Sequence, residues 1–269
     1  MDIKKKINRA FELLEKFFSR HWFNPFATVY LNLRCLPLRQ AVKLPVWLYG
    51  RPRLMNLSGR IELGEVRPGM VRFNMMIIGS PSNMGAQSEL NIGGTIRFEG
   101  KARIRTGIRI VVDEDGLLEF GDNLILGDFI NIGCARHIRI GHSARIAHRS
   151  QIFDTNYHYV VNLQKGIVPP LCKPVTVGDN CWICNTATIS AGACVPDNTI
   201  ISSNSLVNKD FSSIPEYSII GGTPARLIGS GFRLVSKLPK EREITAFYRE
   251  HPGEIFRFPD DADPDRWFG

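Results

Sequence analysis

A single histidine stands where a repeating pattern of aliphatic residues breaks off. His158 lies six positions after Ile152, where the repeat calls for another aliphatic residue, and the irregular segment "HYVVNLQKGIVPPLCKP" begins with it. A neutral imidazole can take the proton of an attacking hydroxyl, which makes histidine a common general base near neutral pH. A lone histidine can also be a structural residue. Its place at the start of a loop extruded from a regular scaffold favours the catalytic interpretation.

A carboxylate precedes this histidine by four positions. Asp154 could orient the imidazole of His158 and stabilise its charged form, as a carboxylate does in a catalytic triad. An aspartate at a corner of the chain can instead cap its own turn by accepting backbone hydrogen bonds. Both interpretations stay open on the sequence alone.

The other histidines and the cysteines give little support for a metal centre. His142 and His148 are six positions apart, and His137 lies five before His142, so these three could be compared with zinc ligands. A three-sided coil would point His142 and His148 from different faces. Cys181 and Cys184 form a lone CxxC motif at positions where small residues are common, and no second CxxC completes a tetrahedral site. We therefore expect no metal cofactor.

The elements that must hold these residues are short and periodic. In residues 177–207 an aliphatic residue recurs at every sixth position, and a small residue follows each by four positions. A helix repeats near 3.6 and a half-buried strand near 2, so neither explains the pattern. Six-residue units cannot bury their apolar face alone, so three of them should form a triangular coil of about 18 residues, and coils should stack. The pattern predicts that Val177 lies over Val195, Ile183 over Ile201 and Ile189 over Val207.

Three interruptions of the repeat predict segments that leave the coil. Residues 113–116 read as an extruded turn, about two residues are inserted near 136–139, and a long loop covers 158–174. Proline and glycine in the long loop exclude a regular coil there.

The two ends of the chain fall outside the repeat. The sequence of residues 7–18 predicts an amphipathic helix. This helix either packs on its own protein or lies on an anionic membrane surface. Residues 241–250 predict a short helix in the tail. We expect an N-terminal helical region (1–26), a coil domain (27–229) that contains the long loop, and a C-terminal tail (230–269).

Composition narrows the choice of partners and location. No apolar run reaches the roughly 18 residues that span a bilayer, and no segment reads as a signal peptide. The net charge is +8, but the basic residues are dispersed and accompany no nucleic-acid-binding motif. Phosphate-bearing small molecules or anionic lipid explain the charge equally well, so nucleic acid is not expected. The cytoplasm is the expected location, at the inner face of the membrane if the N-terminal helix binds there.

The C-terminal motifs resemble those of hexapeptide-repeat acyltransferases. The stretch "VTVGDNCWICNTATISAGACVPDNTIISSNSLVNKD", followed by "GGTPARLI", matches the family pattern V-x-I-G-x-x-x-W-I-G, hexads, V-x-K-D and G-x-P-A-[KR]. "FDTNYH" resembles the family's D-x-[DN]-x-H segment, and residues 30–54 resemble its N-terminal lead-in. The most similar form is the O-acetyltransferases of capsule and lipopolysaccharide gene clusters, related to galactoside and maltose acetyltransferases. The likeness covers most of residues 27–229.

This resemblance implies a fold, an assembly and a site. The fold would be all-β, a left-handed parallel β-helix, and the assembly a homotrimer with three active sites between neighbouring subunits. Acetyl-CoA would be the co-substrate and His158 the catalytic base, with Asp154 as its partner. Trp182 would form a wall of the cofactor groove. The other cofactor-binding residues would be Asn185, Ser203 and Asn208 along the pantetheine arm, and Lys209 and Arg226 at the phosphates.

The expected reaction is O-acetylation of a sugar hydroxyl in a surface polysaccharide or its precursor, by direct attack on the thioester. The alternatives are N-acetylation of an amino sugar, a zinc carbonic anhydrase-like β-helix, and a non-catalytic scaffold. Two departures from the family pattern concern the substrates. Cys184 replaces the usual glycine after Trp-Ile, and the acidic acceptor-binding residue is missing near Cys134 and Ala135. The acceptor should therefore be held differently from galactoside.

Overall fold

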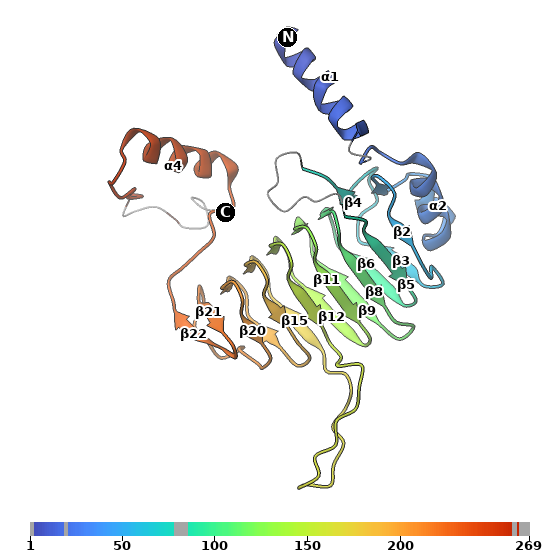
Figure 1. The fold of residues 1–269 in the computed structure, drawn as a ribbon, viewed down its shortest axis with the longest axis vertical. Helices are drawn as coiled ribbons and strands as arrows, with labels where there is room; N and C mark the ends of the chain where they lie inside the picture. The colour runs from blue at the N-terminus through green and yellow to red at the C-terminus, as the bar shows by residue number, and fades with distance from the viewer. Residues whose placement is uncertain (1–2, 19–20, 78–85, 260–262, 264–269) are drawn as a thin grey trace.

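The body of the molecule is a left-handed parallel β-helix with three flat sides (Figure 1). The computed structural model describes residues 3–18, 21–77, 86–259 and 263. One side is a nine-stranded sheet: β1 (Val46–Leu48), β4 (Val71–Met75), β7 (Ala102–Arg105), β10 (Leu124–Leu126), β13 (Arg145–Ile146), β16 (Trp182–Ile183), β19 (Ile200–Ile201), β21 (Ile219–Gly222) and β22 (Ala225–Gly229). The second side is a seven-stranded sheet: β2 (Arg53–Leu54), β5 (Glu89–Ile92), β8 (Arg109–Val112), β11 (Asn131–Cys134), β14 (Gln151–Phe153), β17 (Thr188–Ile189) and β20 (Leu206–Val207). The third is a six-stranded sheet: β3 (Arg60–Leu63), β6 (Thr95–Phe98), β9 (Leu117–Phe120), β12 (His137–Ile140), β15 (Val175–Val177) and β18 (Cys194–Val195).

The predicted stacking of the hexads is confirmed. Val177 pairs with Val195, Ile183 with Ile201 and Ile189 with Val207, all in parallel strands. These aliphatic side chains are at most 1% exposed, so they fill the prism. The small residues that follow them are buried as well, because the chain bends inward there: Cys181, Ala187, Ala193, Thr199 and Ser205.

Two helices close the first coil of the prism, and the sequence did not predict them. They are α2 (Pro25–Cys35) and α3 (Leu38–Ala41). Asn32 Nδ2 donates to the carbonyl of Val46 at 2.7 Å, and the Val46 N–H donates back to Asn32 Oδ1 at 3.2 Å. The Leu48 N–H donates to Thr28 Oγ1 at 3.0 Å. These contacts satisfy the backbone of β1, which would otherwise be an open sheet edge.

Helices also flank the prism at both ends of the chain. The predicted N-terminal helix is confirmed as α1 (Ile3–Phe18), and its described side chains are exposed. The predicted tail helix is confirmed as α4 (Leu238–Glu250), which follows the antiparallel hairpin of β21 and β22. In the described part of the chain, no helix is long and apolar enough to cross a membrane.

Candidate active site

The three interruptions that the sequence indicates lie along one edge of the prism. This is the edge where the seven-stranded sheet passes into the six-stranded sheet, and we call it the loop edge (residues 93–94, 113–116, 135–136, 154–174 and 208–210). Paired residues in adjacent coils are 18 positions apart where the repeat is regular, as for Val177 and Val195. The spacing is 20 positions from Phe120 to Ile140 and 37 from Ile140 to Val177. Insertions from successive coils therefore meet in space, although they are far apart in sequence.

Asp154 fastens the base of the long loop to the coil before it. Its side chain is 0% exposed. The carboxylate accepts hydrogen bonds from the backbone N–H groups of Ala135 at 2.8 Å, Arg136 at 2.7 Å and His137 at 2.6 Å. Its own carbonyl accepts from the Lys173 N–H at 2.9 Å, which brings the two ends of the loop together. Of the two roles open on the sequence, these contacts support capping of a turn, here one in the neighbouring coil. Orientation of His158 by Asp154 stays a prediction.

Tyr157 fixes the backbone immediately before His158. It has a φ of 58°, a left-handed conformation, and its N–H donates to Thr155 Oγ1 at 3.1 Å. Its ring lies edge-on to Phe153, with centroids 6.3 Å apart. A Cβ added to Gly133 would lie 2.4 Å from the Tyr157 hydroxyl oxygen, so the glycine allows the tyrosine to lie over β11. His158 itself is exposed on the single chain, at the loop edge as its place in the repeat suggested.

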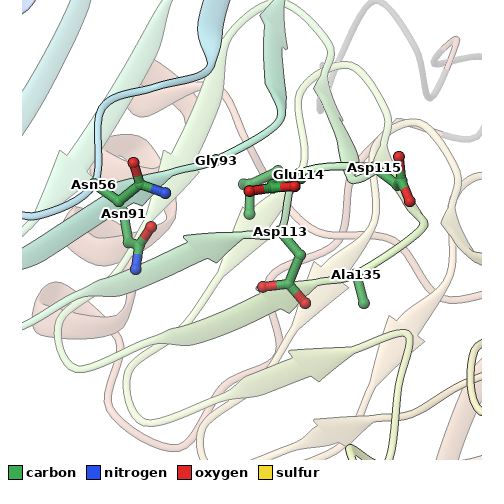
Figure 2. Close-up of a pocket in the computed structure, with 8 residues that line it drawn as sticks. Asn56, Asn91, Gly93, Asp113, Glu114, Asp115 and Ala135 are labelled. Carbon is green, nitrogen blue, oxygen red and sulfur yellow. The ribbon is translucent and has the colours of Figure 1, made fainter.

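A polar cavity of about 490 Å³ opens on the same edge, on the coils before the loop (Figure 2). Burial raises the pKa of Asp113, and the charge of Asp154 raises it further. Burial also raises the pKa of Tyr157, and the charge of Asp113 adds to that shift. The cavity is lined by Asn56, Asn91, Gly93, Val112, Asp113, Glu114, Asp115 and Ala135.

Sequence reasoning missed the carboxylate in this cavity. The family's acidic acceptor-binding residue is absent near Ala135, but Asp113 from the preceding coil lines the cavity together with that alanine. The Asp113 N–H donates to the Cys134 carbonyl at 2.9 Å, which holds the inserted turn against the next coil. The available signal was the interruption at 113–116, which read only as an extruded turn.

The predicted cofactor residues are divided between different parts of the prism. Asn185 and Ser203 lie where the nine-stranded sheet passes into the seven-stranded sheet, and we call this the turn edge. There the Asn204 N–H donates to the Asn185 carbonyl at 3.1 Å, so the two turns stack. Asn208 and Lys209 lie instead at the loop edge, where Lys209 Nζ is 5.0 Å from the ring centroid of Phe211.

The remaining two predicted cofactor residues lie on the nine-stranded sheet. Trp182 borders a smaller cavity of about 220 Å³ together with Arg105, Arg145 and His148. Arg226 is exposed on β22. One chain thus brings Asn185 close to Ser203, and Asn208 close to Lys209, but leaves His158 on a different edge from Asn185.

The histidines considered as zinc ligands make separate contacts. His137 Nε2 lies 2.7 Å from Glu119 Oε2, on the six-stranded sheet. His142 Nε2 lies 3.0 Å from Glu99 Oε2, and its Nδ1 accepts from the Asp122 N–H at 2.9 Å. Within the described residues, no group of three or more His, Cys, Asp or Glu side chains could hold a metal ion.

Comparison with known proteins places these features in context. No family model matches the chain. Over 143 residues the chain is 26% identical to the "Putative lipopolysaccharide biosynthesis O-acetyl transferase WbbJ" of Escherichia coli K12. The match covers 50% of this chain and 71% of that relative. The chain is similar in sequence to an acetyltransferase over half of its length. The resemblance to hexapeptide-repeat acetyltransferases noted in the C-terminal motifs is thereby confirmed.

Two further relatives extend this comparison. Over 122 residues the chain is 30% identical to a chloramphenicol acetyltransferase of Agrobacterium fabrum, over 42% of this chain and 54% of that relative. The chain thus spans about half the length of that acetyltransferase. The crystal structure of the polysialic acid O-acetyltransferase OatWY covers 74% of this chain and 100% of its own, with 20% identity and a TM-score of 0.45.

Proposed function

We propose that the chain is an acetyl-CoA-dependent O-acetyltransferase that acts on a sugar hydroxyl of a surface polysaccharide or its precursor. The observation that carries the proposal is the position of His158, exposed at the loop edge where the regular coils give way to the long loop. The relation to acetyltransferases, one of them named for lipopolysaccharide biosynthesis, supports the reaction and the class of acceptor.

In the proposed reaction His158 acts as a general base. Its neutral imidazole accepts the proton of the acceptor hydroxyl while the hydroxyl oxygen attacks the thioester carbonyl, and the thiolate of CoA leaves. The imidazolium then returns the proton to the departing sulfur, so atoms and charges balance. A direct transfer is favoured over a covalent intermediate on Cys134. That thiol is buried at the loop edge, and its pKa is raised by burial and by the charge of Asp154, which disfavours the nucleophilic thiolate.

We assign the acceptor to the cavity beside Asp113. Its amide and carboxylate groups suit the donors and acceptors of a saccharide, and it opens at the loop edge, where the candidate base lies. Asp113 would accept hydrogen bonds from sugar hydroxyls. It would thus replace, from a neighbouring coil, the acidic residue that the family carries near Ala135.

The complete site requires a second copy of the chain. The turn edge and the loop edge are separated by one side of the prism, about 15 Å for a strand and its turns. Asn185 and Ser203 at the turn edge therefore meet His158 only if the turn edge of one copy faces the loop edge of another. Such a head-to-tail contact closes into a ring, and we propose a homotrimer with acetyl-CoA held in each of its three grooves. Trp182, Asn208, Lys209 and Arg226 remain the further residues proposed for the cofactor.

We place the enzyme in the cytoplasm, where acetyl-CoA is supplied. All six cysteines are free thiols, which suits a reducing compartment. The exposed helix α1 is proposed to contact the inner face of the membrane, as its amphipathic sequence suggested.

Acetyl-CoA turnover by His158→Ala tests the proposed function. Loss of a general base should lower kcat about 100-fold or more, with the thermal unfolding midpoint unchanged. His251→Ala, an exposed histidine beyond α4, is the matched control and should keep wild-type activity. Near-wild-type activity of His158→Ala with a saccharide acceptor would overturn the proposal.

A further inference from the structure

Helix α2 exposes a row of apolar residues on the outside of the molecule. Phe26 is 85% exposed, Val29 41%, Tyr30 56% and Leu33 52%. Their spacing of three, four and seven positions places them on one side of the helix. The opposite side buries Leu31 and Cys35 in the core and contributes Thr28 and Asn32 to the hydrogen bonds with β1. An ordinary surface helix has polar residues on its outer side, so the exposed apolar row of α2 departs from that arrangement.

The apolar surface continues onto α3 and is bordered by basic residues. Leu38 is 68% exposed and Val42 is 66% exposed. Arg34, Arg39 and Lys43 are exposed in the same segment. We call this surface the cap face and define it by six residues: Phe26, Val29, Tyr30, Leu33, Leu38 and Val42. Figure 1 shows α2 at the end of the prism that carries the first coil.

The charge of the chain is concentrated at this end. The basic residues are spread along the sequence, but the acidic residues are not, and none occurs between Glu15 and Glu62. Residues 1–60 contain 12 Lys and Arg against 3 Asp and Glu, a net charge of +9. Residues 61–269 contain 22 Lys and Arg against 23 Asp and Glu, a net charge of −1. The net charge of +8 therefore belongs to the N-terminal segment, and the coils and tail are close to neutral.

We propose that the cap face docks on an anionic lipid bilayer. Exposed aromatic and aliphatic side chains bordered by arginine and lysine are what an interfacial helix presents to the boundary between headgroups and acyl chains. The absence of acidic residues from this segment selects an anionic surface, because each basic residue near such a surface adds attraction. Helix α1 would add a second contact through exposed Phe11 and Leu14, with Arg9 beside them. The docking surface stands apart from the loop edge.

Docking of the cap face also sets the distance between the candidate active site and the membrane surface. This consequence rests on the proposed function. The first coil contains β1, and the long loop leaves the fifth coil, after β13 and β14. Four steps of about 4.8 Å between adjacent strands place His158 about 20 Å from the cap face. The headgroup layer is only about 5–8 Å thick. The acceptor hydroxyl would then belong to a saccharide that extends from the membrane, and not to a lipid headgroup.

Co-sedimentation of the full-length protein with vesicles tests the docking. We expect binding to phosphatidylcholine vesicles that contain phosphatidylglycerol, and much weaker binding to phosphatidylcholine alone. Phe26→Ser/Leu33→Ser should weaken binding more than about 10-fold. Arg39→Gln/Lys43→Gln should weaken it about 30-fold at low salt, about fivefold for each charge. Ile255→Ser, which changes a 73% exposed aliphatic residue near the C-terminus, is the matched control and should bind normally.

Three results would overturn the proposal. The first is failure of the wild-type protein to bind anionic vesicles. The second is loss of binding on removal of α1 but not in the Phe26→Ser/Leu33→Ser variant, because α1 alone would then be the contact. The third is a reduced oligomeric state of that variant in light scattering with unchanged vesicle binding, because the cap face would then join copies of the chain. Since vesicle binding needs neither His158 nor acetyl-CoA, it can fail or succeed independently of the catalytic proposal.

Discussion

The substitution Asp154→Asn tests how the loop edge is held together. The carboxylate is fully buried and accepts three backbone N–H groups of the turn at residues 135–137. An asparagine retains one oxygen and places an NH₂ group where the second oxygen was, so at least one N–H faces a donor. A hydrogen bond to a charged group contributes about 1.5–3 kcal/mol, and a buried donor without a partner costs a further 1–3 kcal/mol. We expect a loss of about 3 kcal/mol in the free energy of unfolding.

Differential scanning calorimetry gives the readout. For a chain of 269 residues, about 3 kcal/mol corresponds to a fall in Tm of about 5 °C. Asp210→Asn is the control, since that carboxylate is exposed to solvent although it accepts a hydrogen bond from the Ser212 N–H at 2.7 Å. It should leave the Tm within about 2 °C of wild type. A fall of less than about 2 °C for Asp154→Asn would refute the structural role. The pH profile of kcat/KM, measured well below the Tm, separately tests orientation of His158, because loss of an orienting carboxylate would shift the apparent pKa of the base.

Three further substitutions test other parts of the structure. Burial raises the pKa of Glu119, but the hydrogen bond from His137 and the charge of Arg97 outweigh it and hold the pKa below the ordinary value of 4.5. The stability that such a carboxyl contributes is present above pH 4.5 and is lost as the pH falls through the folded-state pKa. Glu119→Gln should therefore flatten the acid end of a plot of Tm against pH. An unchanged slope would contradict the pairing of Glu119 with His137 and Arg97. Gly133→Ala places a Cβ against the Tyr157 hydroxyl and within 2.6 Å of the Phe153 ring, so both aromatic side chains must move, and the variant should lower kcat and Tm together. In a Tyr157→Ala background the alanine at 133 should have a smaller effect, since only the overlap with Phe153 remains, and strictly additive effects in this double-mutant cycle would rule out the Tyr157 contact. Asp113→Asn should raise the KM for the saccharide about 10-fold or more while the KM for acetyl-CoA stays the same, and equal effects on both would remove Asp113 from the acceptor cavity.

The sequence was sufficient for features that repeat along it. The six-residue spacing predicted which aliphatic residues stack, and the pairs of Val177 with Val195 and Ile183 with Ile201 follow it. The same spacing located His158 as the residue that ends the regular register. These features are local, since one coil of 18 residues sets the position of the next.

Features that depend on irregular spacing between coils could not be predicted. Asp154 reaches Ala135 only because the coil between them holds 20 positions, and nothing in either segment indicates the other partner. Asp113 joins Ala135 in one cavity for the same reason. Helix α2 was missed because no single apolar stripe marks it. Its buried side mixes Thr28 and Asn32, which pair with β1, with apolar Leu31 and Cys35, and its exposed side carries apolar residues as well.

A mixture of two inactive variants tests most directly whether the site is shared between copies. His158→Ala removes the base at the loop edge, and Ser203→Trp fills the groove at the turn edge, so each protein alone should be inactive. In trimers assembled at random from an equal mixture, about a quarter of the grooves would combine an intact loop edge with an intact turn edge. We predict that unfolding and reassembling the mixture restores about a quarter of the wild-type acetyl-CoA turnover. A reassembled mixture that forms trimers and stays inactive would contradict a shared site.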